Sequence, residues 1–281
     1  MLVRHTRSQI AFLLRQKEAV LTFCVLLLLV LANFVDNCQE YRGFDVMALA
    51  HTTKMGLLSW NRMTYKADLT MIFIQLYPLL VVCPAGFILA KERATQEHML
   101  MITRMGSGVY YFSKLLSAFV VTAVVFTLPF LVEIVLHVIA FSTKPMGDLT
   151  NWDYYSEEYI ELVRGYMFSD LFIHTPYGYA VVKVLLFGLF SGLMGVFSVA
   201  VSALYRVKFR ITVFLPTFLL LNLSVYAKVI FGEMEKSIAW YNFVMLHEEA
   251  VKNMTVFLVT LALVIIVSVS GTFWAARRDQ L

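Results

Sequence analysis

The stretch KERATQEHMLMITRMGSGVYYFSK, residues 91–114, is a polar, helix-forming segment between two long apolar runs. Its middle, Thr95 to Met105, has the composition of a short helix, and Gly106 and Gly108 are residues at which such a helix would stop. Four basic residues outnumber two acidic ones in it: Lys91, Arg93, Arg104 and Lys114 against Glu92 and Glu97. The pattern predicts a short polar helix that joins two membrane-embedded runs.

Composition places the rest of the chain in a membrane. Of its 281 residues, 60% are apolar and only 15% are charged, and the mean hydropathy is +0.74. Soluble domains have about 45 to 50% apolar and about 25% charged residues. The net charge of +4 is therefore read through its distribution between loops rather than as a sign of a nucleic-acid partner, and no nucleic acid is expected.

Six apolar runs are long enough to cross the hydrocarbon core, which takes about 20 helical residues. We expect an all-α polytopic protein with six transmembrane helices in a single domain, residues 1–281. The third run is too long for one straight crossing, so we expect it to tilt or to kink near Pro129. The runs are Ala19 to Val35, Leu69 to Ala90, Tyr111 to Phe141, Tyr177 to Leu204, Ile211 to Phe231 and Thr255 to Ala276.

Lys and Arg between the runs indicate the orientation. Thirteen lie in the N-terminal tail, the second and fourth intervening segments and the C-terminal end, against eight in the three longer segments on the other side. Basic residues collect on the cytoplasmic side of membrane proteins. Both termini and residues 91–114 are therefore expected in the cytoplasm, and the protein is expected in the plasma membrane of a bacterium.

Three further segments have a predicted place at the membrane. Residues 1–18 alternate apolar and basic side chains as an interfacial amphipathic helix does, although a simple positively charged leader fits equally well. Residues 142–176 form an acidic extracellular loop. Residues 232–254 form an extracellular loop in which an aromatic stretch predicts a re-entrant element or an aromatic belt.

Several kinds of chemistry lack their sequence pattern. There is no GxxxxGK[ST] phosphate-binding loop, so the chain is expected to bind no ATP itself and not to be an enzyme. His247-Glu248-Glu249 begins like a zinc-protease motif, but Val251 stands where the second His is required. The three cysteines have no metal-ligand spacing. No catalytic, metal or cofactor-binding residues are predicted.

Two groups inside the apolar runs are candidate sites. Glu133 and His137 lie four residues apart on one face of the third run, and a proton relay, a substrate contact and a structural pair are all compatible with them. In the fourth run, small residues at helical spacing predict close helix packing: Gly188, Ser191, Gly192 and Gly195.

The polar segment resembles the loop between spans two and three of the permease subunits of type-2 (ABC-2) exporters, which belong to the ATP-binding cassette class. In that family the loop runs from a Glu through Gly-Thr and a Leu-rich turn to Thr-Pro, then a Ser, and ends at a Lys below span three. Here Ala94 replaces the Gly and Arg104 the Pro. The positions that correspond to this pattern, these two replacements included, are Glu92, Ala94-Thr95, Glu97, Met99-Leu100, Thr103-Arg104, Ser107 and Lys114.

The resemblance implies that this chain forms the transport passage and that separate subunits hydrolyse ATP. Such permeases pair with a second copy or a paralogue, and two cytoplasmic ATPase subunits bind ATP and Mg and push on a coupling helix, here about Thr95 to Met105. It implies export of an amphipathic substrate, such as a peptide, lipid or drug, by alternating access. The residues implied to contact the ATPase are Glu92, Thr95, Glu97, Met99, Leu100, Thr103, Arg104 and Met105.

Other functions fit the sequence less completely. A stand-alone channel or secondary transporter would place ionisable residues in several spans, and a membrane enzyme would need a complete catalytic set. A non-transporting immunity or sensor protein is the remaining alternative.

Overall fold

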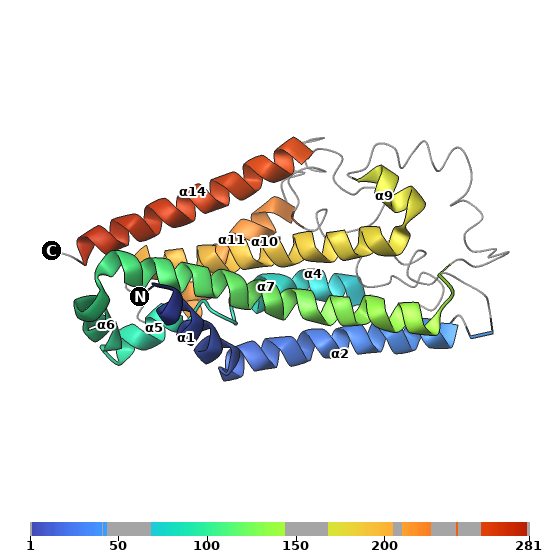
Figure 1. Cartoon of the computed structure of the whole chain (residues 1–281), viewed down its shortest axis with the longest axis horizontal. Helices are drawn as coiled ribbons and strands as arrows, with labels where there is room; N and C mark the ends of the chain where they lie inside the picture. The colour runs from blue at the N-terminus through green and yellow to red at the C-terminus, as the bar shows by residue number, and fades with distance from the viewer. Residues whose placement is uncertain are drawn as a thin grey trace.

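Helix α7 (Ser107–Ala140) is the longest described helix, and the other long helices pack along it. This computed structural model describes residues 2–40, 42–43, 69–143, 168–204, 210–225, 240 and 254–279, and all regular structure in these ranges is helical. α7 packs most extensively against α10 (Pro176–Leu204) and also contacts α1, α2 and α14. Figure 1 shows the long helices running lengthwise, with both chain ends at the same end.

Four described helices are long and apolar enough to cross a membrane, which makes this an all-helical, multi-pass membrane protein. They are α2 (Lys17–Glu40), α7, α10 and α14 (Met254–Arg278). Their outer faces leave large apolar side chains uncovered, as a surface against lipid tails requires. Examples are Leu21, Leu28, Val135, Ile139, Leu185, Leu263, Ile266 and Phe273.

The expected six spanning helices are not found among the described residues, which contain four. The second predicted span is divided into α4 (Leu69–Leu80), turns over residues 81–87 and α5 (Ile88–Ala94). Pro84 cannot donate a hydrogen bond and crowds the carbonyl one turn earlier, which interrupts a regular helix there. The Cys83 amide accordingly donates to the Leu80 carbonyl, 3.1 Å away and only three residues back.

The fifth predicted span is also shorter than expected. It consists of a 3-10 turn, η2 (Arg210–Val213), and α11 (Phe214–Val225), whose 12 residues are too few to cross a 30 Å core. The predicted continuation to Phe231 lies outside the described residues. The possible re-entrant element in 232–254 also lies outside them, apart from Trp240 and the start of α14.

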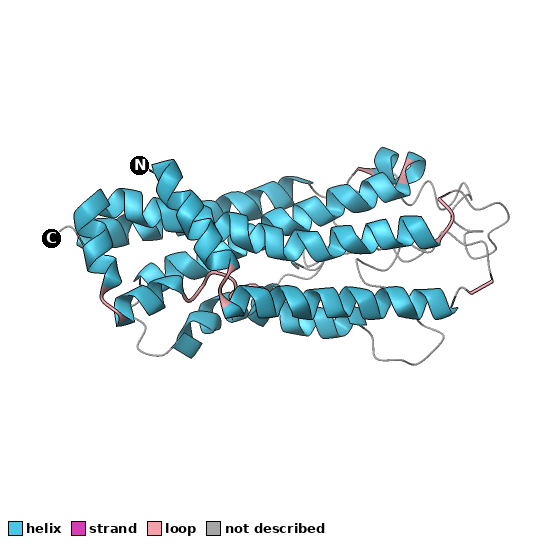
Figure 2. Ribbon diagram, turned by 60° about the horizontal axis from the view of Figure 1, so that its bottom comes forward, coloured by secondary structure: helices cyan, strands magenta, loops and turns pink. Residues whose placement is uncertain are grey.

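The remaining predicted segments are short helices at the two ends of the bundle. α1 (Leu2–Leu14) lies within the predicted N-terminal helix, and α6 (Glu97–Met105) within the predicted coupling segment. Of the acidic loop 142–176, the structure describes the beginning and a six-residue helix, α9 (Ser169–His174). α1 and α6 lie at the end that carries the termini, and α9 lies at the opposite end (Figures 1 and 2).

Aromatic rings fill the centre of the bundle. Tyr77 on α4 is fully buried and stacks on Trp240 with ring centroids 4.2 Å apart. Phe187 on α10 makes edge contacts with Phe126 and Phe130 on α7, at 5.9 and 5.5 Å. These rings tie α4, α7 and α10 together, and each aromatic pair contributes about 0.5–1.5 kcal/mol beyond the area that it buries.

Candidate functional site

Helix α6 is a separate short helix set off by two backbone reversals. Gln96 precedes it in the left-handed conformation, with φ of 58°. Gly106 follows it with φ of 82°, a value that glycine adopts without strain, and its amide donates to the Ile102 carbonyl at 2.8 Å. Gly106 also directly precedes α7, so the end of α6 and the beginning of α7 share one residue.

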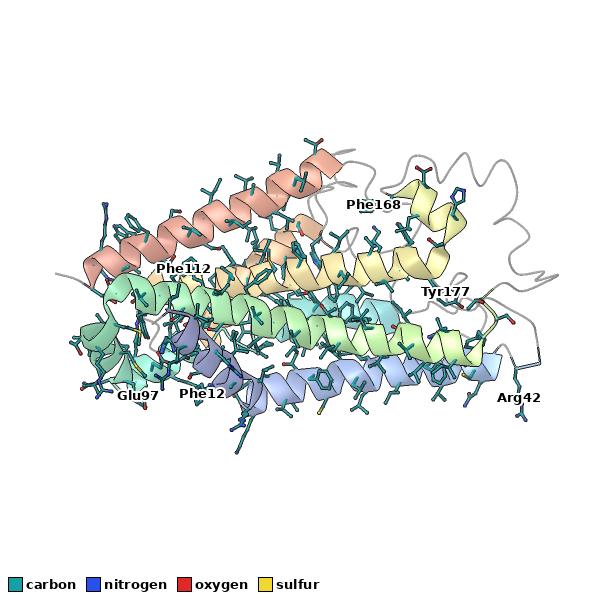
Figure 3. All side chains as sticks on the ribbon, in the orientation of Figure 1. Phe12, Arg42, Glu97, Phe112, Phe168 and Tyr177 are labelled. Carbon is teal, nitrogen blue, oxygen red and sulfur yellow. The ribbon has the colours of Figure 1, made fainter. Side chains whose placement is uncertain are left out.

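The two faces of α6 differ in their contacts. Met101, Ile102 and Met105 are partly buried against the core of the protein. The opposite face is exposed and includes Met99 and Leu100, whose exposed fractions are 59% and 62%. Exposed Thr103 lies among them, and exposed Glu97 and Arg104 flank them on the same helical arc. Glu97 points away from the bundle in Figure 3.

The structure therefore separates the residues predicted to contact an ATPase. Thr95, Glu97, Met99, Leu100, Thr103 and Arg104 are exposed, and Met105 is partly buried. Glu92 is buried, with 7% of its surface exposed, and faces the interior. It is therefore not part of the exposed surface that the other predicted contact residues form.

Glu92 is part of a buried charge centre below α6. One carboxylate oxygen forms an ion pair with Lys114 of α7, whose side chain is fully buried. The other accepts a hydrogen bond from the Tyr110 hydroxyl at 2.5 Å. The Lys114 ammonium also donates to Gln9 Oε1 of α1 at 2.7 Å. The centre thus ties α1, α5 and α7 together at one point.

A second polar centre holds the adjoining end of α10. The Arg93 guanidinium donates to the carbonyls of Ser202 and Ala203, at 2.7 and 2.9 Å. Arg278 of α14 donates to the carbonyls of Leu204 and Ala203, at 3.1 and 3.3 Å. The last carbonyls of a helix lack partners within it and carry partial negative charge, so cationic donors stabilise them.

His5 of α1 lies next to the Glu92–Lys114 centre. Burial and the positive charge of Lys114 lower the pKa of His5, and the charge of Glu92 partly opposes this shift. Its Nε2 atom is buried and has no hydrogen-bond partner in the part of the chain that the structure describes. His5 and Arg4, Ser8, Arg104, Met105 and Val109 line a pocket of about 290 Å³ between α1, α6 and the start of α7.

Glu133 and His137 are both buried, but each side chain bonds to α2 rather than to the other. Asn33 donates to the Glu133 carboxyl, and Asn37 Nδ2 lies 3.0 Å from His137 Nε2. His137 Nδ1 lies 2.8 Å from the Glu133 backbone carbonyl, which can only accept. This network assigns the proton to Nδ1 and leaves Nε2 to accept from Asn37.

The small residues of α10 face α7 closely. A methyl group at Gly188 would overlap Thr127 Oγ1, and one at Gly195 would lie 2.5 Å from Thr122 Oγ1. A methyl group at Gly192 would lie 2.9 Å from the backbone carbonyl oxygen of Phe119. Ser191 is also buried here, and its hydroxyl lies 3.1 Å from the Tyr77 hydroxyl.

Sequence reasoning missed two features of these sites. Asn33 lies near the end of the first apolar run and Asn37 just beyond it, and their spacing of four residues, which matches that of Glu133 and His137, could have identified them as partners. The second is Lys183, whose side chain is fully buried in α10, has no hydrogen-bond partner among the described residues and lies 5.5 Å from the Tyr179 ring centre.

Comparisons with protein-family models, curated proteins and solved structures find no match to this chain. Within the described ranges, no cluster of three or more His, Cys, Asp and Glu side chains could hold a metal ion. What defines the class of protein is thus its own fold, a multi-pass helical membrane protein. Its distinguishing site is the exposed face of α6 above the Glu92–Lys114 centre.

Proposed function

We propose that this chain is the membrane subunit of an ATP-driven exporter and that α6 is the helix through which a separate ATPase subunit acts on it. The observation that carries the proposal is the exposed face of α6, which presents Met99 and Leu100 to solvent at the end that holds both termini. Full burial of each such side chain contributes about 1.5–3 kcal/mol. An amphipathic helix with this surface fits a groove in a partner protein.

Charges at the edge of the face give the contact a direction. Glu97 lies in the first turn of α6 and Arg104 in its last turn. A partner groove with the opposite order of charges would bind α6 in one orientation and reject the reverse. A coupling helix requires such a fixed binding orientation, because the movement of the ATPase must displace the helix in one defined direction.

The support of α6 suits it to transmit movement. Gly106 joins α6 to α7 without an intervening loop, so displacement of α6 moves the beginning of a 34-residue helix. Below it, the Glu92–Lys114 ion pair resists independent movement of α5 and α7. Packed elements that shift as units convert small displacements into a change between two arrangements.

The complete exporter has further components in this proposal. Two ATPase subunits hold ATP and Mg, and a second copy of the chain, or a paralogue, completes the passage for an amphipathic substrate. The bilayer surrounds the exposed apolar faces. ATP hydrolysis takes place on the partner, so the chain itself is a transporter subunit rather than an enzyme.

A second candidate, a transporter or channel that acts alone, is favoured by one observation. Lys183 on α10 and Glu133 and His137 on α7 place buried ionisable groups in two spans. Such groups are costly inside a membrane and often mark ion or proton pathways. Transport that proceeds without an ATPase would support this candidate.

The proposal expects a P-loop ATPase in a neighbouring reading frame, and the test is co-purification of the chain with that ATPase. The variant Met99→Ala/Leu100→Ala and the charge reversal Glu97→Lys should each reduce the bound ATPase at least roughly tenfold, as loss of 1.4 kcal/mol or more implies. Val3→Ala is a matched control, because Val3 is an exposed apolar residue on α1. Retention of the complex and of stimulated ATP hydrolysis in both α6 variants would refute the proposal.

A further inference from the structure

The pocket between α1 and α6 has the composition of an anion site. Two guanidinium groups, Arg4 and Arg104, an imidazole, His5, and a hydroxyl, Ser8, provide its polar lining, and Met105 and Val109 provide the apolar part. No acidic side chain lines it among the described residues. Its volume of about 290 Å³ exceeds that of a single water molecule, about 30 Å³, several-fold.

The lining residues come from two elements that are separate in sequence. Arg4, His5 and Ser8 come from α1, where Ser8 lies four residues after Arg4 and three after His5, the spacings at which side chains are neighbours on a helix surface. Arg104 reaches the pocket from the last turn of α6. The pocket therefore exists only where α1 lies beside the coupling helix.

One lining residue has an unmatched polar atom. His5 Nε2 is buried and has no hydrogen-bond partner among the described residues, which costs free energy unless a ligand supplies one, and in the Nε2–H tautomer it can donate to an anion. The two arginines of the lining also repel each other when nothing lies between them. An anion with several acceptor oxygens would satisfy the imidazole and both guanidinium groups together.

We propose that this pocket binds a phosphate group and thereby joins α1 to α6. Planar guanidinium groups match tetrahedral oxyanions with paired hydrogen bonds, and the Ser8 hydroxyl supplies a further donor. The two sources of such a group are the headgroup of an anionic phospholipid and free phosphate. The proposal does not depend on the exporter function, because it concerns only the pocket.

The position of α1 favours the lipid headgroup as the source. Val3, Phe12 and Leu14 leave 81%, 56% and 40% of their surfaces exposed on this helix, next to the apolar ends of the spanning helices. Such side chains enter the boundary between headgroups and acyl chains, where phosphate groups are abundant. Basic residues at this depth recognise anionic headgroups.

The experiment uses the full chain, purified in mild detergent and examined by native mass spectrometry with phosphatidylglycerol or phosphatidylcholine, and by thermal unfolding with inorganic phosphate. The test variant is Arg4→Gln, and a second variant, Ser8→Glu, places a negative charge in the pocket without removing a cation. Arg7→Gln is the matched control, because Arg7 is exposed on α1 but does not line the pocket. Circular dichroism verifies that each variant is folded.

Retention of phosphatidylglycerol over phosphatidylcholine, weakened roughly tenfold by Arg4→Gln and by Ser8→Glu but not by Arg7→Gln, would support a lipid headgroup. Stabilisation by inorganic phosphate with the same pattern among the variants, and no preference between the two lipids, would support free phosphate. Equal behaviour of all variants towards both probes would overturn the proposal. An equal loss in Arg7→Gln would also overturn it, because it would show only a general effect of net charge.

Discussion

Removal of one partner of the buried ion pair between Glu92 and Lys114 should be far more harmful than removal of both charges. In Lys114→Met, the Glu92 carboxylate stays buried and keeps only the hydrogen bond from Tyr110. Breaking a buried pair in this way typically costs about 3–5 kcal/mol. The double variant Lys114→Met/Glu92→Gln leaves no charge, and the new amide still accepts from Tyr110, so we expect a loss below about 2 kcal/mol.

The matched control is the ion pair between Lys91 and Glu18, which joins the neighbouring α5 to α2. Its atoms are 2.6 Å apart, but both side chains are partly exposed, at 26% and 32%. Solvent screens such a pair, and we expect Lys91→Met to cost about 0.2–1 kcal/mol. Proximity alone would make the two pairs similar, so the comparison isolates the effect of burial.

The assay is equilibrium unfolding in mixed micelles, monitored by far-ultraviolet circular dichroism. It compares the wild type with Lys114→Met, Glu92→Gln, the double variant and the control Lys91→Met. The reasoning requires the loss in the double variant to be smaller than the loss in Lys114→Met. If the losses of the single variants add in the double variant, or if Lys114→Met costs no more than Lys91→Met, then the pair does not form the buried centre described above.

Three further predictions concern packing, buried charge and pH. Gly192→Ala should destabilise the protein by about 1–3 kcal/mol, because the added methyl group would lie 2.9 Å from the Phe119 carbonyl oxygen. Gly108→Ala should stabilise it by about 0.5–1 kcal/mol, because no described atom lies within 4 Å of the added methyl group and Ala favours a helix more than Gly does. Thermal unfolding of both variants measures the difference, and equal effects would contradict it. Lys183→Met should raise the unfolding temperature, because it removes a fully buried amine that has no hydrogen-bond partner among the residues described. A lower temperature would show that Lys183 has a favourable role. Burial lowers the pKa of His5 in the folded protein below its usual value of about 6.5. At pH values between the folded-state pKa and about 6.5, the unfolded chain therefore binds more protons than the folded protein. The free energy of unfolding should fall as the pH is lowered through this range. The change in unfolding temperature between pH 7.5 and pH 5.5 should therefore be smaller in His5→Gln than in the wild type, and an unchanged difference would show that His5 does not contribute.

The long helices could be predicted from the sequence because hydropathy over about 20 residues is a local property. The run Tyr177 to Leu204 was predicted with the bounds of the candidate span that the structure shows. The prediction that the second span is one continuous helix was wrong. Hydropathy measures the apolar character of residues 81–87, but it does not register that Pro84 has no backbone N–H to donate. Prolines are tolerated in many membrane helices, so the residue alone did not decide the outcome.

The candidate site could be predicted only in outline. Gly106 marked the end of α6, since a glycine after a polar helix is a local signal. The inward direction of Glu92 could not be found in this way, because it depends on contacts between distant parts of the chain. Glu92 pairs with Lys114, 22 residues away, and Lys114 also donates to Gln9, 105 residues away from it. Pairing between distant segments is set by how the helices pack, which a single sequence does not display.

The polar contacts at this end of the bundle explain how one short helix could influence several spans. Arg93 lies on α5, next to Glu92, and donates to the carbonyls of Ser202 and Ala203 at the end of α10. Arg278 of α14 also donates to the Ala203 carbonyl, and to that of Leu204. Residues 92 and 93 thus connect α7 and α10 through adjacent side chains that point to different partners. A displacement of α5 and α6 would strain both connections at once. In the proposed exporter, coupling at this end would therefore run through charged and hydrogen-bonded contacts, and high salt should affect the Glu92–Lys114 pair little because it is buried.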